Sequence, residues 1–248
     1  MKKIKLFLTL VLCLSLACVL TFKVNANETS GVTYYASPTG LKTNSGLSAE
    51  EPLEILTALY KLRIDDTLIL ASGTYDMVEE PDYIDPNDLQ AKKFGNVELN
   101  QSGRFGHYIT VKGIGDVILD FSDQPFDSSN RGITIKGSYW HFDNVKITKA
   151  GDNGLYIGGA YNVIENCEFF ENRDSGLQLG RSNGDLTDVN DWPSNNLIKN
   201  CTSYANYDDE TYGENADGFA AKLTVGYGNV FDGCIAYRNS DDGWDLYA

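Results

Sequence analysis

The chain has 248 residues, with 35 Asp and Glu against 20 Lys and Arg, and a formal net charge of −15. So acidic a chain repels nucleic acid and anionic membranes, and we expect neither as a partner. Five cysteines, of which three follow residue 26, are too few and of the wrong parity for a disulfide scaffold.

Residues 1–26 have the pattern of an export signal. Three lysines precede an apolar run over residues 6–22, and a small-residue cleavage site ends at Ala26. The alternatives are a single membrane anchor and a lipoprotein signal at Cys18. Export predicts a secreted, extracellular protein, and we expect the remaining domain, residues 27–248, to be a monomer without membrane contact.

The first half of this domain contains short β-rich segments. Thr33–Ser37 is predicted to be a strand, and Pro52 begins a short amphipathic helix with leucines near one face. Such a helix would cap the open end of a β-structure, where unpaired strands aggregate. Early turns of the fold are predicted over residues 65–75, 107–121 and 132–137, and an elaborated loop over residues 76–101.

From residue 140 the sequence repeats itself, with an initial period of about 22 residues. The copies are WHFDNVKITKA (140–150), NVIENCEFFEN (162–172), NLIKNCTSYAN (196–206) and NVFDGCIAYRN (229–239). A turn and a second short strand follow each copy, and the insertions Gly180–Asn195 and Tyr207–Ala216 lengthen the later spacings. Alternating residues punctuated by Gly and Asn exclude helical repeats and predict an all-β parallel β-helix, a solenoid.

In a parallel β-helix, equivalent residues of successive turns stack on one another. The predicted columns are an internal one of Val145, Cys167, Cys201 and Cys234, and one at a bend made of Asn172, Asn206 and Asn239. Stacked cysteines point the same way, so we expect free, buried thiols rather than a disulfide. Stacked asparagines can exchange hydrogen bonds along the axis.

A group of aspartates is predicted at one corner of the coil. Asp217 and Asp242 each precede a glycine at equivalent positions of adjacent turns, Asp241 flanks that column, and Asp245 faces out from the following strand. Four converging carboxylates repel one another unless a cation neutralises them. Oxygen ligands without His or Cys favour Ca²⁺. The alternative is a set of Asx-turn residues that face water.

The stretches ENADGFAAK (214–222) and NSDDGWDLY (239–247) closely resemble family nine polysaccharide lyases. These are pectate lyases built on a right-handed parallel β-helix. The resemblance runs from about Thr33 to the C-terminus and is strongest after Gly151. It implies that Asp217, Asp241, Asp242 and Asp245 bind a catalytic Ca²⁺. It also implies that the substrate is pectate, that is polygalacturonate, which is cleaved by β-elimination after loss of the proton at C5.

The resemblance also implies a catalytic lysine in a Gly-Phe-Lys-like stretch on a later turn, which would lie beyond Ala248. The catalytic base is therefore unassigned, and we expect the chain to be truncated at its C-terminus and to give only trace elimination. Lys222 and Arg238 are either cations that help an acidic protein bind an acidic polymer or solvated surface charges. His107 and His141 lie in strand patterns and are expected to be structural.

Two other functions stay open on the sequence alone. A polygalacturonase-type glycoside hydrolase would use Asp217, Asp241 and Asp242 as acid and base, although FGHY (105–108) does not supply the usual Gly-His-Gly element. A non-catalytic, calcium-stabilised solenoid would bind polysaccharide without cleaving it.

Overall fold

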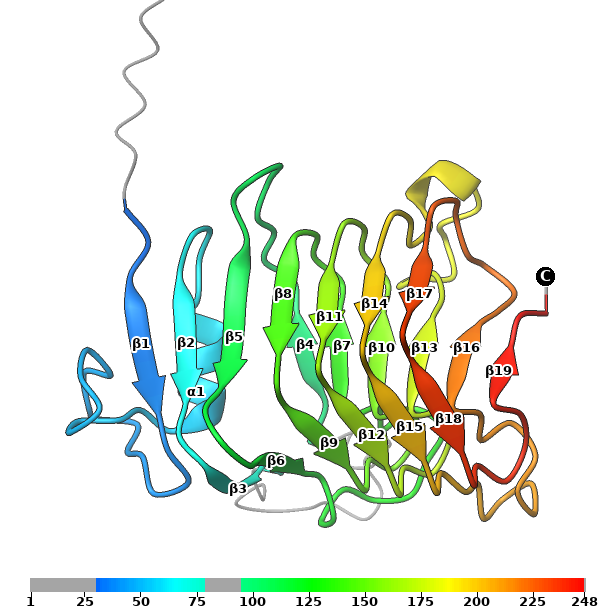
Figure 1. The fold of residues 1–248 in the computed structure, drawn as a ribbon, viewed down its shortest axis with the longest axis horizontal. Coiled ribbons are helices and arrows are strands. Elements are labelled where there is room, and N and C mark those ends of the chain that lie inside the picture. The colour runs from blue at the N-terminus through cyan, green and yellow to red at the C-terminus, as the bar shows by residue number, and fades with distance from the viewer. Residues whose placement is uncertain (1–29, 79–94, 248) are drawn as a thin grey trace, which may run out of the picture.

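The computed structural model describes residues 30–78 and 95–247, and these form a single coil of β-strands (Figure 1). The predicted export signal, residues 1–26, lies outside the described residues, as does most of the predicted loop 76–101. Among the described residues, no helix has the length and apolar character needed to cross a membrane.

Three parallel sheets run along the coil, and most turns contribute one strand to each. Sheet A contains β1 (Thr33–Ala36), β2 (Thr67–Leu70), β5 (Ile109–Gly113), β8 (Trp140–Asp143), β11 (Val163–Glu165), β14 (Leu197–Lys199) and β17 (Val230–Asp232). Sheet B contains β3 (Gly73–Asp76), β6 (Val117–Asp120), β9 (Lys146–Thr148), β12 (Glu168–Phe170), β15 (Thr202–Tyr204) and β18 (Ile235–Tyr237). Sheet C contains β4 (Val97–Leu99), β7 (Ile133–Ile135), β10 (Leu155–Ile157), β13 (Leu177–Leu179), β16 (Phe219–Ala221) and β19 (Trp244–Asp245). The predicted all-β parallel β-helix is confirmed.

The core fills the space between the sheets with the residues that the alternation predicts to point inward. Leu155 pairs with Leu177, and Leu177 pairs with Phe219, in one register along sheet C. All three side chains are fully buried. On the last described turn the equivalent residue, Trp244, is 38% exposed because no further described strand covers it.

The bend between sheets A and B depends on residues that accept a left-handed backbone. Asn144, Asn166 and Asn200 have φ values of 57°, 55° and 51°, and Gly233 has a φ of 66° at the same place. Asparagine and glycine adopt this conformation at the lowest cost. An Asn or Gly directly before Val145 and before each of the three cysteines of the repeat therefore predicts this bend.

The predicted column of cysteines is present. Val145, Cys167 and Cys201 are buried, Cys234 is partly exposed, and the three cysteines are free thiols. The Cys201 Sγ lies 3.5 Å from the carbonyl oxygen of Ile164 on the preceding turn. The thiols therefore pack as small side chains in the core, as predicted.

The asparagine column forms the predicted hydrogen-bonded ladder. Asn172 donates from its amide to Asn206 (3.0 Å), and Asn206 donates in turn to Asn239 (2.8 Å). A second ladder, which the sequence analysis did not predict, lies at another bend and consists of Asn162, Asn196 and Asn229. The two ladders satisfy buried backbone and amide groups where the chain leaves the sheets.

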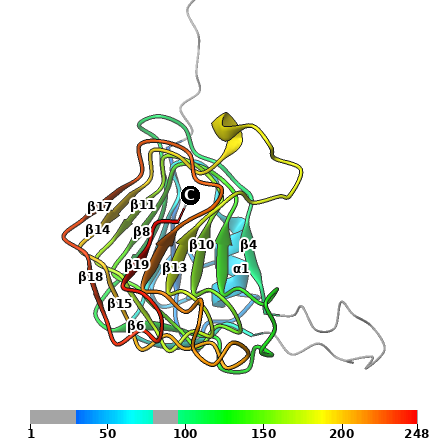
Figure 2. The ribbon, with the colours of Figure 1, turned by 90° about the vertical axis from the view of Figure 1, so that its right-hand side faces the viewer.

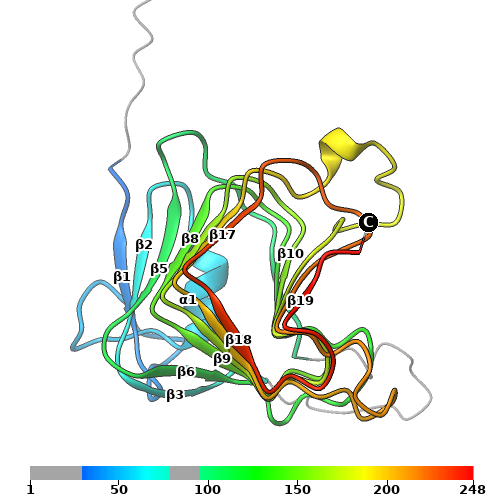
Figure 3. The same ribbon diagram turned by 45° about the vertical axis from the view of Figure 1, so that its right-hand side comes forward.

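Helix α1 (Ile55–Lys61) lies at the N-terminal end of the coil (Figure 3). It begins three residues later than predicted because Glu54 is its N-cap, accepting hydrogen bonds from the backbone N–H groups of Leu56 and Thr57. Leu59 and Leu62 are fully buried. The helix therefore covers the end of the core, as expected of a cap.

Strand β4 lies within residues 76–101, a range that was predicted to be a loop. Val97 and Leu99 are buried, and the strand pairs in parallel with β7. A three-residue strand carries too little alternation to be recognised from sequence, so its position depends on the neighbouring turn.

Candidate metal centre and its relatives

Two adjacent strands of sheet C bring the predicted aspartates together. Asp217 lies just before the glycine that precedes β16, and Asp242 holds the same position before β19. The two strands pair in parallel, with Phe219 opposite Trp244. Because equivalent residues of successive turns are neighbours, residues 25 positions apart in the sequence meet at one corner.

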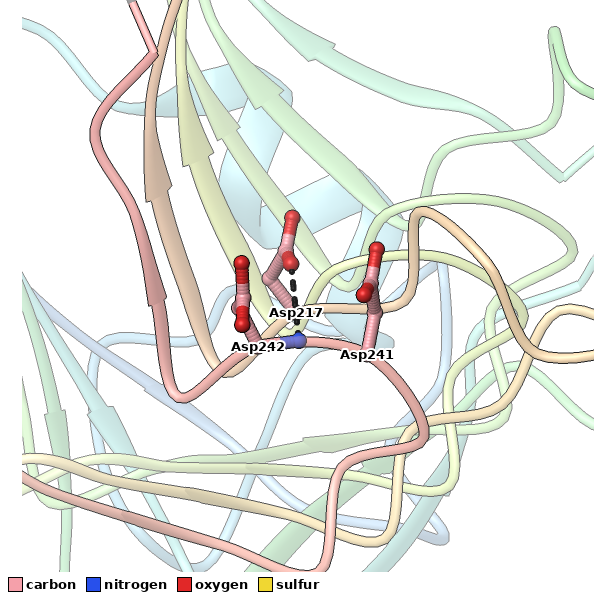
Figure 4. Close-up of side chains that lie close together, drawn as sticks. All are labelled: Asp217, Asp241 and Asp242. Atoms are coloured by element: carbon pink, nitrogen blue, oxygen red, sulfur yellow. Dashed lines mark hydrogen bonds between the residues drawn. The ribbon is translucent and has the colours of Figure 1, made fainter.

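The carboxylates of Asp217, Asp241 and Asp242 form a group of three (Figure 4). One oxygen from each lies within 4.8 Å of the others, and the three side chains point to the same side. Two oxygens bound to one Ca²⁺ at about 2.3–2.6 Å can lie up to about 5 Å apart. The spacing and the all-oxygen donor set therefore fit a hard divalent cation.

Asp217 is the fixed member of this group. Its side chain is fully buried, and its Oδ1 accepts a hydrogen bond from the backbone N–H of Asp242 (3.2 Å). The Ser175 hydroxyl donates to its Oδ2 (3.1 Å). Burial raises the pKa of Asp217 above its ordinary value, although hydrogen bonds and the charge of Lys222 oppose the rise. A bound cation would favour the ionised form.

Asp241 and Asp242 lie at the exposed side of the group. The backbone N–H of Asn215 donates to Asp241 Oδ2 (2.9 Å), so the acidic insertion, residues 207–216, helps to orient this carboxylate. The group is thus buried on one side and open to solvent on the other, which leaves room for an ion and for a ligand of that ion.

Asp245 reaches the group through a lysine. Lys222 Nζ lies 2.9 Å from Asp217 Oδ2 and 3.0 Å from Asp245 Oδ2, and the lysine side chain is only 13% exposed. Three of the four predicted carboxylates therefore converge directly, whereas the fourth is joined by an ammonium bridge. The sequence offered one signal for this bridge. Lys222 is four residues after Gly218 and Asp245 is two residues after Gly243, so the alternation predicts that both side chains face outward on neighbouring turns.

The bridge controls the charge of both partners. Burial lowers the pKa of Lys222, but its hydrogen bonds to Asp217 and Asp245 outweigh burial and leave that pKa above its usual value. For Asp245, burial raises the pKa, while the backbone N–H of Tyr247 and the charge of Lys222 bring it below the usual value. With its two short contacts to carboxylates, Lys222 is a counter-ion within this site, not the solvated surface charge that the sequence also allowed.

A second acidic pair, which sequence reasoning missed, lies on the two preceding turns. Asp152 is almost fully buried, and burial together with the nearby charge of Asp174 raises its pKa to about 8. Asn153 donates to Asp174 Oδ1 (3.0 Å), and Arg131 Nε lies 3.4 Å from Asp152 Oδ2. We call Asp152 and Asp174 the upstream pair.

The other residues named from sequence lie elsewhere. His107 Nδ1 lies 2.9 Å from Asp65 Oδ1, and His141 Nε2 lies 2.9 Å from Glu165 Oε1, which agrees with a structural role for both histidines. Arg238 is exposed just after β18 in sheet B.

Comparison with known proteins identifies the family. Residues 34–248 match the model described as Pel9A-like, right-handed β-helix region, and the chain belongs to this family. Pectate lyase L of Paenibacillus polymyxa (strain SC2) is 41% identical over 153 residues, which cover 60% of this chain and 34% of that protein. Pectate lyase L of Dickeya chrysanthemi is 31% identical over 237 residues, which cover 92% of this chain and 51% of that protein.

The fold comparison agrees. The crystal structure of pectate lyase Pel9A matches with a TM-score of 0.74 and 33% sequence identity, over 88% of this chain and 52% of that one. The chain therefore spans between a third and about half of the length of these relatives. The resemblance to polysaccharide lyases and the right-handed β-helix are confirmed, and with them the assignment to a lyase family rather than to the glycoside hydrolases.

Proposed function

We propose that this protein is an exported pectate lyase that cleaves polygalacturonate by calcium-assisted β-elimination. The observation that carries the proposal is the group of three carboxylates on adjacent turns of a pectate lyase fold. Asp217, Asp241 and Asp242 would hold the ion, and Asp245 is the proposed fourth ligand. Residues 1–26 would direct export, and the mature chain would act as a monomer.

Calcium would supply a Lewis acid that binds the uronate carboxylate and stabilises the negative charge that develops at C5. The chain's own residues prepare this position. Burial and hydrogen bonds from Ser175, Lys222 and the backbone of Asp242 fix Asp217. Asp241 and Asp242 are exposed, on the side where a polymer would approach. An acidic protein would thus meet an acidic polymer through a cation.

Lys222 is better suited to this charge balance than to proton abstraction. A general base needs a pKa near the working pH, whereas two carboxylates hold the pKa of Lys222 above its ordinary value. We therefore assign Lys222 an electrostatic role. The catalytic base stays unassigned.

Binding and product analysis with the full chain would test the proposal. Ca²⁺ should bind the protein, polygalacturonate should be retained only when calcium is present, and both effects should be lost in Asp217→Ala. Any cleavage should release unsaturated products that absorb in the near ultraviolet. Saturated products alone would instead indicate a hydrolase, and calcium-independent retention would contradict a role for the metal centre.

A further inference from the structure

We infer that the protein has a uronate-binding subsite at Trp192, on the turn that precedes the metal centre, and this inference rests on the proposed function. The insertion Gly180–Asn195, between β13 and β14, forms one wall of a cavity of about 400 Å³. Trp192 and Leu186 line this wall. The insertion appears in yellow in Figures 1 and 2, where it projects from the coil.

The insertion holds the indole ring in place. Trp192 donates from Nε1 to the carbonyl oxygen of Leu186 (2.8 Å). The 3₁₀ turn η2 (Val189–Asp191) directly precedes the tryptophan, and Asp188 caps it by accepting from the backbone N–H of Asn190 (2.9 Å). A large flat side chain that is already fixed loses little conformational entropy when a ligand packs on it. The ring is therefore suited to binding.

Part of the cavity lining carries almost no side chains. Gly158, Gly159 and Ala160 line it where the chain leaves β10. A Cβ on Gly158 would lie 2.5 Å from the Cβ of Ser182, and a Cβ on Gly159 would lie 1.8 Å from the carbonyl oxygen of Gly137. Glycine is thus required for the close approach of neighbouring turns. A lining of small residues beside an indole, with Ser138 and Asn190, suits a pyranose ring.

Cations in and beside the cavity suit an acidic sugar. Lys136 and Asp191 are the charged residues of this lining, and Lys136 also lines a neighbouring cavity of about 220 Å³, to which Arg131 contributes. Lys136 Nζ lies 2.7 Å from Glu98 Oε2, a bond that uses one of the three donors of an ammonium group. Arg131 is held with its guanidinium carbon 3.5 Å from the ring centre of Tyr156. The smaller cavity is thus lined by two cations and one acid, in a chain whose net charge is −15.

The two sites lie at opposite strand ends of the same sheet. Lys136 follows β7 and Gly158 follows β10, whereas Asp217 and Asp242 precede β16 and β19, further along sheet C. Adjacent strands lie about 4.8 Å apart, so β7 is roughly 14 Å along the axis from β16. A polymer that crosses the sheet while it advances along the axis can occupy both sites only if it is several sugar units long. The subsite would therefore favour long chains over short ones.

The test compares a long oligogalacturonate with digalacturonate, by calorimetry on the full chain with calcium present. Trp192→Ala should weaken binding of the long chain by about tenfold or more, because buried tryptophans often dominate binding, and should leave digalacturonate unchanged. Ala160→Leu, which fills the cavity while keeping the indole, should also weaken long-chain binding. Val189→Ala is the matched control, since it alters an exposed residue of the same insertion that does not line the cavity.

The outcomes separate the two hypotheses. If both Trp192→Ala and Ala160→Leu bind the long chain as the wild type does, the subsite is wrong while the proposed function stands. If the wild type binds neither oligomer in calcium, the proposed function is wrong, and the subsite is overturned with it. An equal loss for long and short chains in Trp192→Ala would assign the tryptophan a structural role and would also overturn the subsite.

Discussion

The upstream pair and the metal centre occupy the same corner of the coil on successive turns, yet they differ in what surrounds their carboxylates. Asp152 is buried beside Arg131, and the partly exposed Asp174 accepts a hydrogen bond from Asn153. At the metal centre, Asp217 is equally buried, but Asp241 and Asp242 beside it are exposed. The repeat therefore supplies a position for an acid, whereas the neighbouring turns determine whether that acid is covered or is open to a ligand.

Loss of the asparagine ladder, which runs beside both regions, should have the largest effect on stability. Asn206 exchanges hydrogen bonds with Asn172 and Asn239, and its amide also donates to Ser203 Oγ (3.1 Å). Because Asn206→Ala leaves several buried polar groups without partners, it should lower the free energy of unfolding by about 3 kcal/mol. Urea unfolding would measure this loss, with the exposed Tyr212→Ala as control. A loss below about 1 kcal/mol would show that the ladder does not hold this corner.

The upstream pair predicts a dependence of stability on pH. Burial and the charge of Asp174 raise the folded-state pKa of Asp152 to about 8, from its ordinary value of 3.8. The folded state therefore binds more protons than the unfolded state between these values, and stability should fall as pH rises from about 4 to 8. In Asp152→Asn, the decrease in the free energy of unfolding between pH 4 and 8 should be smaller by roughly 1–3 kcal/mol.

Thermal unfolding across that range would measure the slope for Asp152→Asn and for the exposed control Asp185→Asn. Equal slopes in the wild type and in Asp152→Asn would show that the upstream pair is ionised in the folded protein.

The ammonium bridge at the metal centre predicts a smaller effect. Because the positive charge of Lys222 repels a divalent cation, Lys222→Met should raise calcium affinity, by about tenfold at low salt, or about 1.4 kcal/mol. Calorimetric titration would measure it, with Lys199→Met on sheet A as control. Weaker calcium binding in Lys222→Met would instead mean that the lysine is needed to position Asp217 and Asp245.

The sequence predicted those features that the repeat itself determines. The Val145–Cys167–Cys201 column and the Asn172–Asn206–Asn239 ladder follow from stacking alone, and so does the meeting of Asp217 with Asp242. What was missed depends on flexible side chains or on very short elements. Lys222 Nζ reaches both Asp217 and Asp245 through a long, flexible side chain, whose conformation the repeat pattern does not determine. Strand β4 has only three residues.

The upstream pair was missed for a related reason. Asp152 and Asp174 each precede an Asn or a Ser rather than the aspartate found at the metal centre, so the pattern did not mark them as a group. Asp152 is covered by Arg131, one turn earlier, whose guanidinium reaches both Asp152 and Tyr156. Such contacts between side chains of different turns cannot be recognised in the repeat pattern of the sequence.

The most direct measurement is a calcium titration of the protein by calorimetry, with variants at the two acidic groups. The wild type should bind one Ca²⁺, and Asp217→Asn and Asp242→Asn should each weaken binding by at least about tenfold, whereas Asp152→Asn should bind calcium as the wild type does. At a hundredfold excess over Kd, calcium should also stabilise the wild type by about 2.7 kcal/mol. Absence of calcium binding, or binding unaffected by Asp217→Asn and Asp242→Asn, would contradict the assignment of the metal centre.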